Sequence, residues 1–250
     1  MSVTSAVLLG GGSERSFRAA LARLDAAQKP GAGVPAYTRW VNRRGARAFA
    51  AAAYRAGIGP NAVSVSGFVL SIAGIGLLLT LRDRPALAGI CAAVTLALGY
   101  VLDSADGQLA RLTGVASPRG EWLDHTLDAF RLPLIHLGVL FAVGASEPLA
   151  LVAAGFAVLA SASFLSQILG AALRSRHDLA PPTPRPGQSW LLLPTDSGVL
   201  CWVFVLWAWP TGFALAYGGL FAANLLHTAA AMRRRWADLG QPETASGGVA

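Results

Sequence analysis

The chain has 250 residues, of which 54% are hydrophobic and only 13% are charged. Its mean hydropathy is +0.51, and a soluble domain carries about 25% charged residues, so the composition excludes an ordinary soluble domain and indicates lipid as the solvent. The net charge of +7 could suggest nucleic acid, but a basic excess in a membrane protein usually marks cytoplasmic loops near anionic headgroups. We therefore expect no nucleic-acid partner.

The N-terminal part of the chain differs from the rest because it is rich in glycine, proline and arginine. We interpret residues 1–35 as a cytoplasmic extension with one short helix around Phe17 to Ala27, and expect no signal peptide in it. Residues 37–57 interleave arginine with Trp40, Phe49 and many alanines. This pattern predicts an amphipathic helix on the cytoplasmic membrane surface, although a soluble surface helix would look similar.

Six long apolar segments follow, at residues 62–81, 86–102, 127–145, 148–173, 192–209 and 211–232. A bilayer crossing needs about 20 residues, so the sequence predicts an all-α integral membrane protein with six transmembrane helices. All but Arg82 and Arg84 of the 20 basic residues then lie on one side of the membrane. The positive-inside rule places both termini in the cytoplasm. Residues 36–235 would form one membrane domain, followed by a flexible cytoplasmic tail at 236–250.

Four aspartates stand out in this apolar part of the chain: Asp103, Asp106, Asp124 and Asp128. Aspartates near a membrane interface often only face water or cap a helix. Here the first two are spaced i, i+3 and the last two i, i+4, so each pair lies on one face of its helix. Two antiparallel helices joined by a short turn can direct both pairs into one volume.

A cluster of four carboxylates needs a positive charge, because like charges repel strongly where little water is present. Divalent cations supply that charge, and hard oxygen ligands select Mg²⁺ or Mn²⁺. Gly107 and Ala110 leave room for a bulky ligand, and the guanidinium of Arg111 can bind a phosphate. The segment therefore predicts a metal and diphosphate site, at the cytoplasmic interface because Asp103 lies about 25 Å along its helix from Ala86.

The same segment resembles the signature of the CDP-alcohol phosphotransferase family, D-x2-D-G-x2-A-R-x8-G-x3-D-x3-D. The fixed positions are Asp103, Asp106, Gly107, Ala110, Arg111, Gly120, Asp124 and Asp128. Upstream, Pro60, Asn61 and Ser64 are similar to the family's entry to the first span. The resemblance covers about residues 37–232 and implies the six-span layout with a preceding surface helix, and a homodimer.

The resemblance also implies a reaction: a substituted phosphate group passes from a CDP-linked alcohol to the hydroxyl of a second alcohol, and CMP is released. It implies that Asp103, Asp106 and Asp124 bind two divalent cations, Mg²⁺ or Mn²⁺, and that Asp128 is the general base and a further ligand. The nucleotide pocket would comprise Asn61, Asp106, Gly107, Ala110 and Arg111.

His125 is a competing general base. With Glu121 it belongs to a run that is similar to the choline and ethanolamine phosphotransferase branch, but this chain is shorter and has fewer predicted spans than that branch. Three arginines leave alternatives open as well. Arg131 could bind an anionic acceptor or extend to the interface, and Arg174 and Arg176 could join the acceptor pocket or simply follow the positive-inside rule.

We expect a role in phospholipid synthesis, with CDP-diacylglycerol as the donor and a polar alcohol as the acceptor. The alternative is transfer from a soluble CDP-alcohol to a lipid or polyol acceptor. A divalent-ion transporter or channel is the alternative of another class, because carboxylates within membrane segments also mark ion pathways. The clustering of the aspartates at one interface counts against it.

Overall fold

The computed structural model describes residues 16–26, 31, 33–180 and 183–240, and this part of the chain contains helices and no β-strand. Most of the expected N-terminal extension and the expected C-terminal tail from residue 241 onward lie outside the described residues. The short helix expected near Phe17 is present as α2, Phe17–Ala26. The all-α prediction is confirmed.

Five long helices make up most of the molecule, and each begins with a proline at its first position, where the missing N–H costs nothing. They are α4 Pro60–Thr80, α5 Pro85–Thr113, α6 Pro118–Val143, α7 Pro148–Arg176 and α10 Pro210–Leu239. The shorter elements are a π-helix, η2, at Thr38–Asn42, then α3 Arg43–Ala56, α8 Gln188–Leu191, η3 Leu193–Thr195, α9 Ser197–Val203 and η4 Phe204–Ala208.

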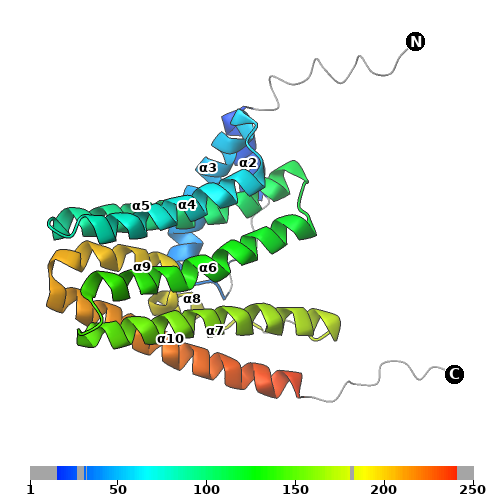
Figure 1. Ribbon diagram of the computed structural model, residues 1–250. Coiled ribbons are helices and arrows are strands. Elements are labelled where there is room, and N and C mark those ends of the chain that lie inside the picture. The colour runs from blue at the N-terminus through cyan, green and yellow to red at the C-terminus, as the bar shows by residue number, and fades with distance from the viewer. Residues whose placement is uncertain (1–15, 27–30, 32, 181–182, 241–250) are drawn as a thin grey trace, which may run out of the picture.

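The long helices run side by side, with α4 and α5 on one side, α6 next to them, and α7 and α10 on the other side (Figure 1). The α2 and α3 helices run across their direction, and α3 packs on α5. The short α9 and η4 helices pack against α5 and α10. The α6 helix therefore lies between α4 and α7, and α5 is held by α4, α3 and the short α9 and η4 helices.

All five long helices are apolar and long enough to cross a membrane. The fifth predicted segment, 192–209, differs, because Pro194 and Asp196 divide it and its apolar helix covers only Ser197–Ala208. At about 1.5 Å per residue this helix is shorter than a bilayer core of about 30 Å. The count of six spans stays a prediction.

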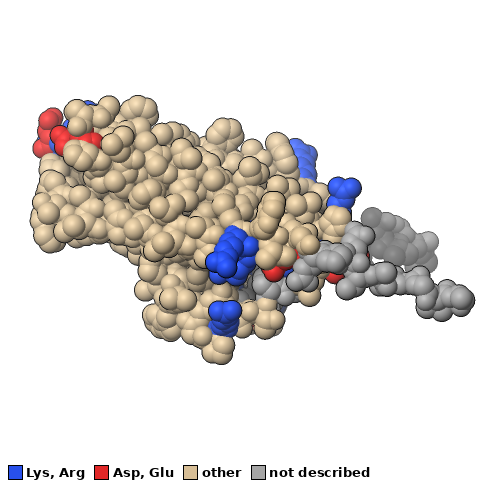
Figure 2. Space-filling model, turned by 90° about the horizontal axis from the view of Figure 1, so that it is seen from below, with Lys and Arg blue, Asp and Glu red and all other residues tan. Residues whose placement is uncertain are grey.

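The outer surface of the bundle is apolar. Large hydrophobic side chains such as Leu151, Val158 and Leu215 are more than two-thirds exposed along the long helices. Figure 2 shows a broad uncharged band between charged side chains at one end of the molecule and those toward the other. Such a surface would aggregate in water but is suited to lipid.

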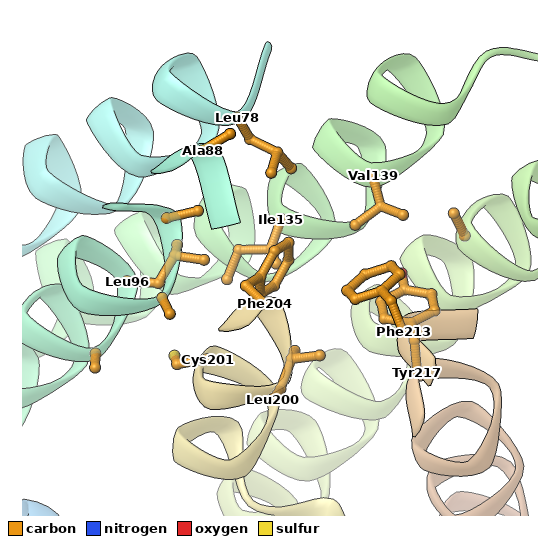
Figure 3. Close-up of a cluster of buried hydrophobic side chains, with 14 of the residues drawn as sticks. Leu78, Ala88, Leu96, Ile135, Val139, Leu200, Cys201, Phe204, Phe213 and Tyr217 are labelled. Atoms are coloured by element: carbon orange, nitrogen blue, oxygen red, sulfur yellow. The ribbon is translucent and has the colours of Figure 1, made fainter. Parts of the chain in front are cut away.

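The largest core lies where the ends of α4 and α5 meet α6, α9 and α10 (Figure 3). Phe204, Phe213 and Tyr217 are buried there; the ring of Phe213 stacks on Tyr217 and meets Phe204 at a tilt. This apolar cluster fixes the short α9 helix between the long ones. The aspartates lie toward the opposite ends of α5 and α6.

Near the middle of the bundle, α4 and α5 approach each other so closely that glycine is required. A Cβ on Gly67 would lie 2.9 Å from the backbone oxygen of Gly99 and 3.3 Å from the backbone nitrogen of Asp103. Close backbone approach at small residues is a common way for helices to pack in membranes. The contact fixes the position of Asp103 relative to α4.

Because this contact is backbone to backbone, replacing Gly67→Ala should lower the stability by about 1–3 kcal/mol, the usual cost of overpacking. Gly76→Ala on the same helix is the matched control, since a Cβ there meets nothing within 4 Å. Thermal unfolding in detergent micelles should show a lower transition for Gly67→Ala and an unchanged or slightly higher one for Gly76→Ala. Equal transitions would contradict the close-packing account.

Candidate active site

The turn between α5 and α6 brings the two aspartate pairs together. Gly114 ends α5 with a φ of 71°, in the left-handed region that favours glycine, and only three more residues precede α6. The side chain of Ser117 then caps α6 by accepting a hydrogen bond of 3.2 Å from the Gly120 N–H. Ser117 and Pro118 thus begin α6, which packs against α4 and α7.

Three of the four aspartates converge. One carboxylate oxygen each from Asp103, Asp124 and Asp128 can be chosen so that all three lie within 4.8 Å of one another. All three side chains are partly buried, and they line one small cleft together with Ser64, Phe68, Leu127 and Arg131. Three carboxylate oxygens at this spacing suit a hard divalent cation such as Mg²⁺ or Mn²⁺.

Asp106 lies deeper than the other three. Only 5% of its surface is exposed, and its carboxylate accepts hydrogen bonds from the Ser64 hydroxyl and from the backbone N–H of Gly107. Both hydrogen bonds favour the charged form of the Asp106 carboxylate. The Ser64 contact ties the start of α4 to the site.

Arg131 provides the positive charge that the cluster needs. Its Nη2 lies 3.1 Å from Asp103 Oδ1 and 2.5 Å from Asp128 Oδ1, and only 5% of the residue is exposed. The guanidinium also stands over the ring of Tyr100, 5.8 Å from its centroid. Of its two alternatives, extension to the interface does not occur, because ion pairing draws the Arg131 side chain inward. It bridges one carboxylate of α5 and one of α6.

The residues expected to bind the nucleotide flank the cluster on the side of the α5–α6 turn. A Cβ on Gly107 would lie 3.5 Å from Arg111 Nη1. The guanidinium of Arg111 therefore lies close to the backbone of α5 at Gly107. A Cβ on Gly120 would lie 3.4 Å from Asn61 Oδ1. Asn61 at the start of α4 therefore lies against the start of α6. Ala110 is one turn beyond Gly107 on the same face of α5.

His125 occupies a different position from Asp128. Its ring nitrogens lie 3.8 Å from Glu121 and 3.9 Å from Asp124, and its ring meets Phe164 of α7 edge-on. These contacts place it beside the cluster, on the side of α6 that faces α7.

The contacts of Arg131, Ser64 and Tyr100 are absent from the sequence-based account. Arg131 follows Asp128 at i+3, a spacing that permits an ion pair on one helix, and this is the only signal in the sequence. Nothing local indicates that Ser64 reaches Asp106 across 42 positions. Tyr100 lies in an apolar segment, and its contacts with Arg131 and Thr38 arise only from the packing of the helices.

Removing Arg131 should destabilise the protein, because it leaves two buried carboxylates without their counter-charge. We expect Arg131→Gln to cost about 3–5 kcal/mol, and saturating Mn²⁺ to restore part of this loss by supplying charge in its place. Arg119→Gln, an exposed position on the same helix, is the control. Thermal unfolding with and without Mn²⁺ measures both effects, and a loss no larger than the control's would refute the counter-charge role.

Comparison with known proteins agrees with the signature. A profile of the CDP-alcohol phosphatidyltransferase family matches residues 58–232. The bifunctional IPC transferase and DIPP synthase of Rubrobacter xylanophilus is 40% identical over 109 residues, which is 44% of this chain and 23% of that protein. The chain thus spans less than a quarter of that relative's length.

Two solved structures are similar, both of the Mycobacterium tuberculosis phosphatidylinositol phosphate synthase. One has CDP-DAG bound, with 20% identity over 84% of this chain and 98% of that one and a TM-score of 0.48. The other, with manganese and citrate, has 20% identity over 81% and 92% and the same TM-score. The family profile covers well over half of the sequence and includes all four aspartates, so the chain belongs to the CDP-alcohol phosphatidyltransferase family.

Proposed function

We propose that this protein catalyses the divalent-metal-dependent transfer of a substituted phosphate group from a CDP-alcohol, CDP-diacylglycerol in the first place, to the hydroxyl of an acceptor alcohol, with release of CMP. The observation that carries the proposal is the convergence of Asp103, Asp124 and Asp128 within the family's signature. A role in phospholipid synthesis follows from such a reaction.

The aspartates would hold two divalent cations, Mg²⁺ or Mn²⁺. Asp103, Asp124 and Asp128 offer converging oxygens, and Asp106 would contribute from its deeper position beside Ser64. When bound, such cations neutralise the charge on the diphosphate and on the departing CMP. Asn61, Gly107, Ala110 and Arg111 would bind the nucleotide next to them.

Asp128 is the better of the two proposed bases. Its Oδ1 is held by Arg131, which leaves Oδ2 to accept a proton from the acceptor hydroxyl. His125 instead lies against Phe164 and close to Asp124 and Glu121. We propose that it contributes to the shape and charge of the site without accepting that proton.

A lipid-linked donor suits the surroundings of the aspartates. Trp122 and Phe130, which lie on α6 on either side of Asp124 and Asp128 in sequence, are 66% and 59% exposed. Large exposed apolar side chains on the outer face of α6 are suited to contact with acyl chains, while the polar cleft would receive the diphosphate. This supports CDP-diacylglycerol over a soluble CDP-alcohol.

The membrane arrangement belongs to the same proposal. We propose six crossings, with the α9–η4 segment as the short one, a cytoplasmic surface helix at residues 37–57 and both termini in the cytoplasm. The distribution of arginine supports this orientation. A homodimer rests on the family resemblance.

The reaction is tested by incubating the purified protein with CDP-diacylglycerol, a panel of alcohols and Mn²⁺ or Mg²⁺ and measuring CMP release. Asp128→Asn should lower the rate by at least about 10²-fold, as expected for loss of a general base. Asp83→Asn, an exposed carboxylate in the α4–α5 loop, should leave the rate unchanged. EDTA should abolish the reaction. The same assay with CDP-choline and CDP-ethanolamine tests the alternative donors, and CMP release equal to that of Asp128→Asn with every pair would disprove the enzyme.

The choice of base is tested by His125→Gln. Because His125 lies beside the cluster and does not converge with it, we expect a change in the rate of CMP release of no more than about threefold, against the 10²-fold or greater loss for Asp128→Asn. A loss for His125→Gln as large as that for Asp128→Asn would show that the histidine accepts the proton.

A further inference from the structure

A second cavity lies next to the aspartate cluster, between α6, α7, α10 and the segment that leads into α9. Its volume is about 140 Å³. A cavity of about 150 Å³ accommodates benzene, so this one fits a small ring or a short chain but not a nucleotide. The residues that line it include Leu132, His136, Ser163, Phe164, Gln167, Asp196, Ser197, Asn224 and Thr228.

The cavity adjoins the proposed general base along one side of α6. Leu132 and His136 follow Asp128 at successive intervals of four residues, so they continue its side of the helix toward the cavity. Phe164, another lining residue, contacts the ring of His125. Asp128 does not itself line the cavity, so a molecule bound there would extend a hydroxyl past Leu132 to reach it.

The lining offers polar atoms that the described residues do not satisfy. His136 is buried, and its Nδ1 pairs with the Tyr217 hydroxyl at 2.7 Å, whereas its Nε2 has no hydrogen bond among the described residues. The Nδ2 of Asn224 donates to two backbone oxygens, which leaves its Oδ1 available. The Ser197 hydroxyl, which is half-buried, has no hydrogen-bond partner in the described part of the chain, and the amide of the exposed Gln167 stands at the rim. Such groups converging on a cavity inside an apolar bundle indicate a polar ligand.

The charge of the lining limits what that ligand is. Among the described lining residues there is no lysine or arginine, and the one charged residue is Asp196. Its carboxylate accepts hydrogen bonds from the Thr38 N–H, the Thr38 hydroxyl and the Gly198 N–H, at 2.7–2.9 Å. Three arginines were candidates for binding an anionic acceptor. Arg131 binds the aspartates and Arg174 pairs with Asp238, while Arg176 is exposed at the end of α7 and does not line the cavity.

We propose that this cavity is the acceptor site and that it selects an uncharged, hydroxyl-rich acceptor, in preference to its phosphorylated counterpart. The proposal rests on the proposed function, since it concerns the second substrate of that reaction. A phosphate group placed in the cavity would lose part of its hydration with no cation among the described lining residues to pair with it, which is unfavourable. Neutral hydroxyls can instead form hydrogen bonds with the imidazole, amide and hydroxyl groups of the lining.

The selectivity is tested with matched acceptors in the CMP-release assay, in mixed micelles with CDP-diacylglycerol and Mn²⁺. The pairs are glycerol against sn-glycerol 3-phosphate and myo-inositol against myo-inositol 1-phosphate. We expect kcat/KM to be at least tenfold higher for the neutral member of at least one pair. Turnover of the phosphorylated members at an equal or higher kcat/KM would overturn this inference while leaving the proposed function intact. CMP release with no acceptor at all would overturn both.

The location is tested by two substitutions in the lining, Gln167→Leu and Ser163→Val, with Ser161→Val as the control on the exposed face of the same helix. The lining variants should raise the KM for the better acceptor at least fivefold and leave the KM for CDP-diacylglycerol within twofold. The control should change neither value, and it and Gln167→Leu should keep the parent's unfolding temperature. Ser163→Val should lower that temperature, because the buried Thr228 hydroxyl loses its partner. A KM for the acceptor that is unchanged in both lining variants, or that rises equally in the control, would show that the acceptor binds elsewhere.

Discussion

The structure depends on a balance of charge between α5 and α6. Carboxylates from both helices converge where water is scarce, and Arg131 lies between Asp103 and Asp128 at hydrogen-bonding distance from each. Without a cation the helices would repel each other at this point, because a low dielectric strengthens the repulsion. The guanidinium therefore allows the bundle to bring the aspartates together, and it leaves other carboxylate oxygens available for metal ions.

Packing holds this charged centre in place from two sides. On one side, the glycine contact between α4 and α5 fixes Asp103, and Ser64 of α4 binds Asp106. On the other side, Tyr100 lies beneath Arg131, and its hydroxyl lies 2.6 Å from that of Thr38, which in turn contacts Asp196. This row of polar contacts connects η2 and the start of α9 to the site. An element on the N-terminal side of the first long helix thus supports residues more than 60 positions away.

Local features of the chain could be predicted from the sequence, whereas contacts between distant segments could not. The aspartate pairs, the cap at Ser117 and the proline starts of the helices depend on spacings within a few residues, and the structure contains them. The partners of Arg131 and Asp106 depend on how the helices pack, which no periodicity reveals. The fifth apolar segment was predicted as one helix because most of its residues are apolar. Asp196 interrupts it by capping α9 through the Gly198 N–H.

The cavity beside Asp128 and the aspartate cluster together give the site two parts of different character. The cluster, with carboxylates and arginines, suits a diphosphate with its metal ions, and the cavity, with amide, imidazole and hydroxyl groups, suits a neutral alcohol. α6 carries residues of both, so one helix would align donor and acceptor. With this division, a small and mostly apolar bundle would hold a charged donor and an uncharged acceptor at one interface.

The central claim is that these aspartates bind metal ions that engage a CDP-linked donor. Anomalous diffraction from crystals grown with Mn²⁺ and CDP-diacylglycerol tests it most directly. The account predicts two manganese peaks among Asp103, Asp106, Asp124 and Asp128, with the diphosphate bound to both ions and the cytidine toward Asn61 and Arg111. A map with no manganese at the aspartates, or with the nucleotide bound elsewhere on the protein, would contradict it.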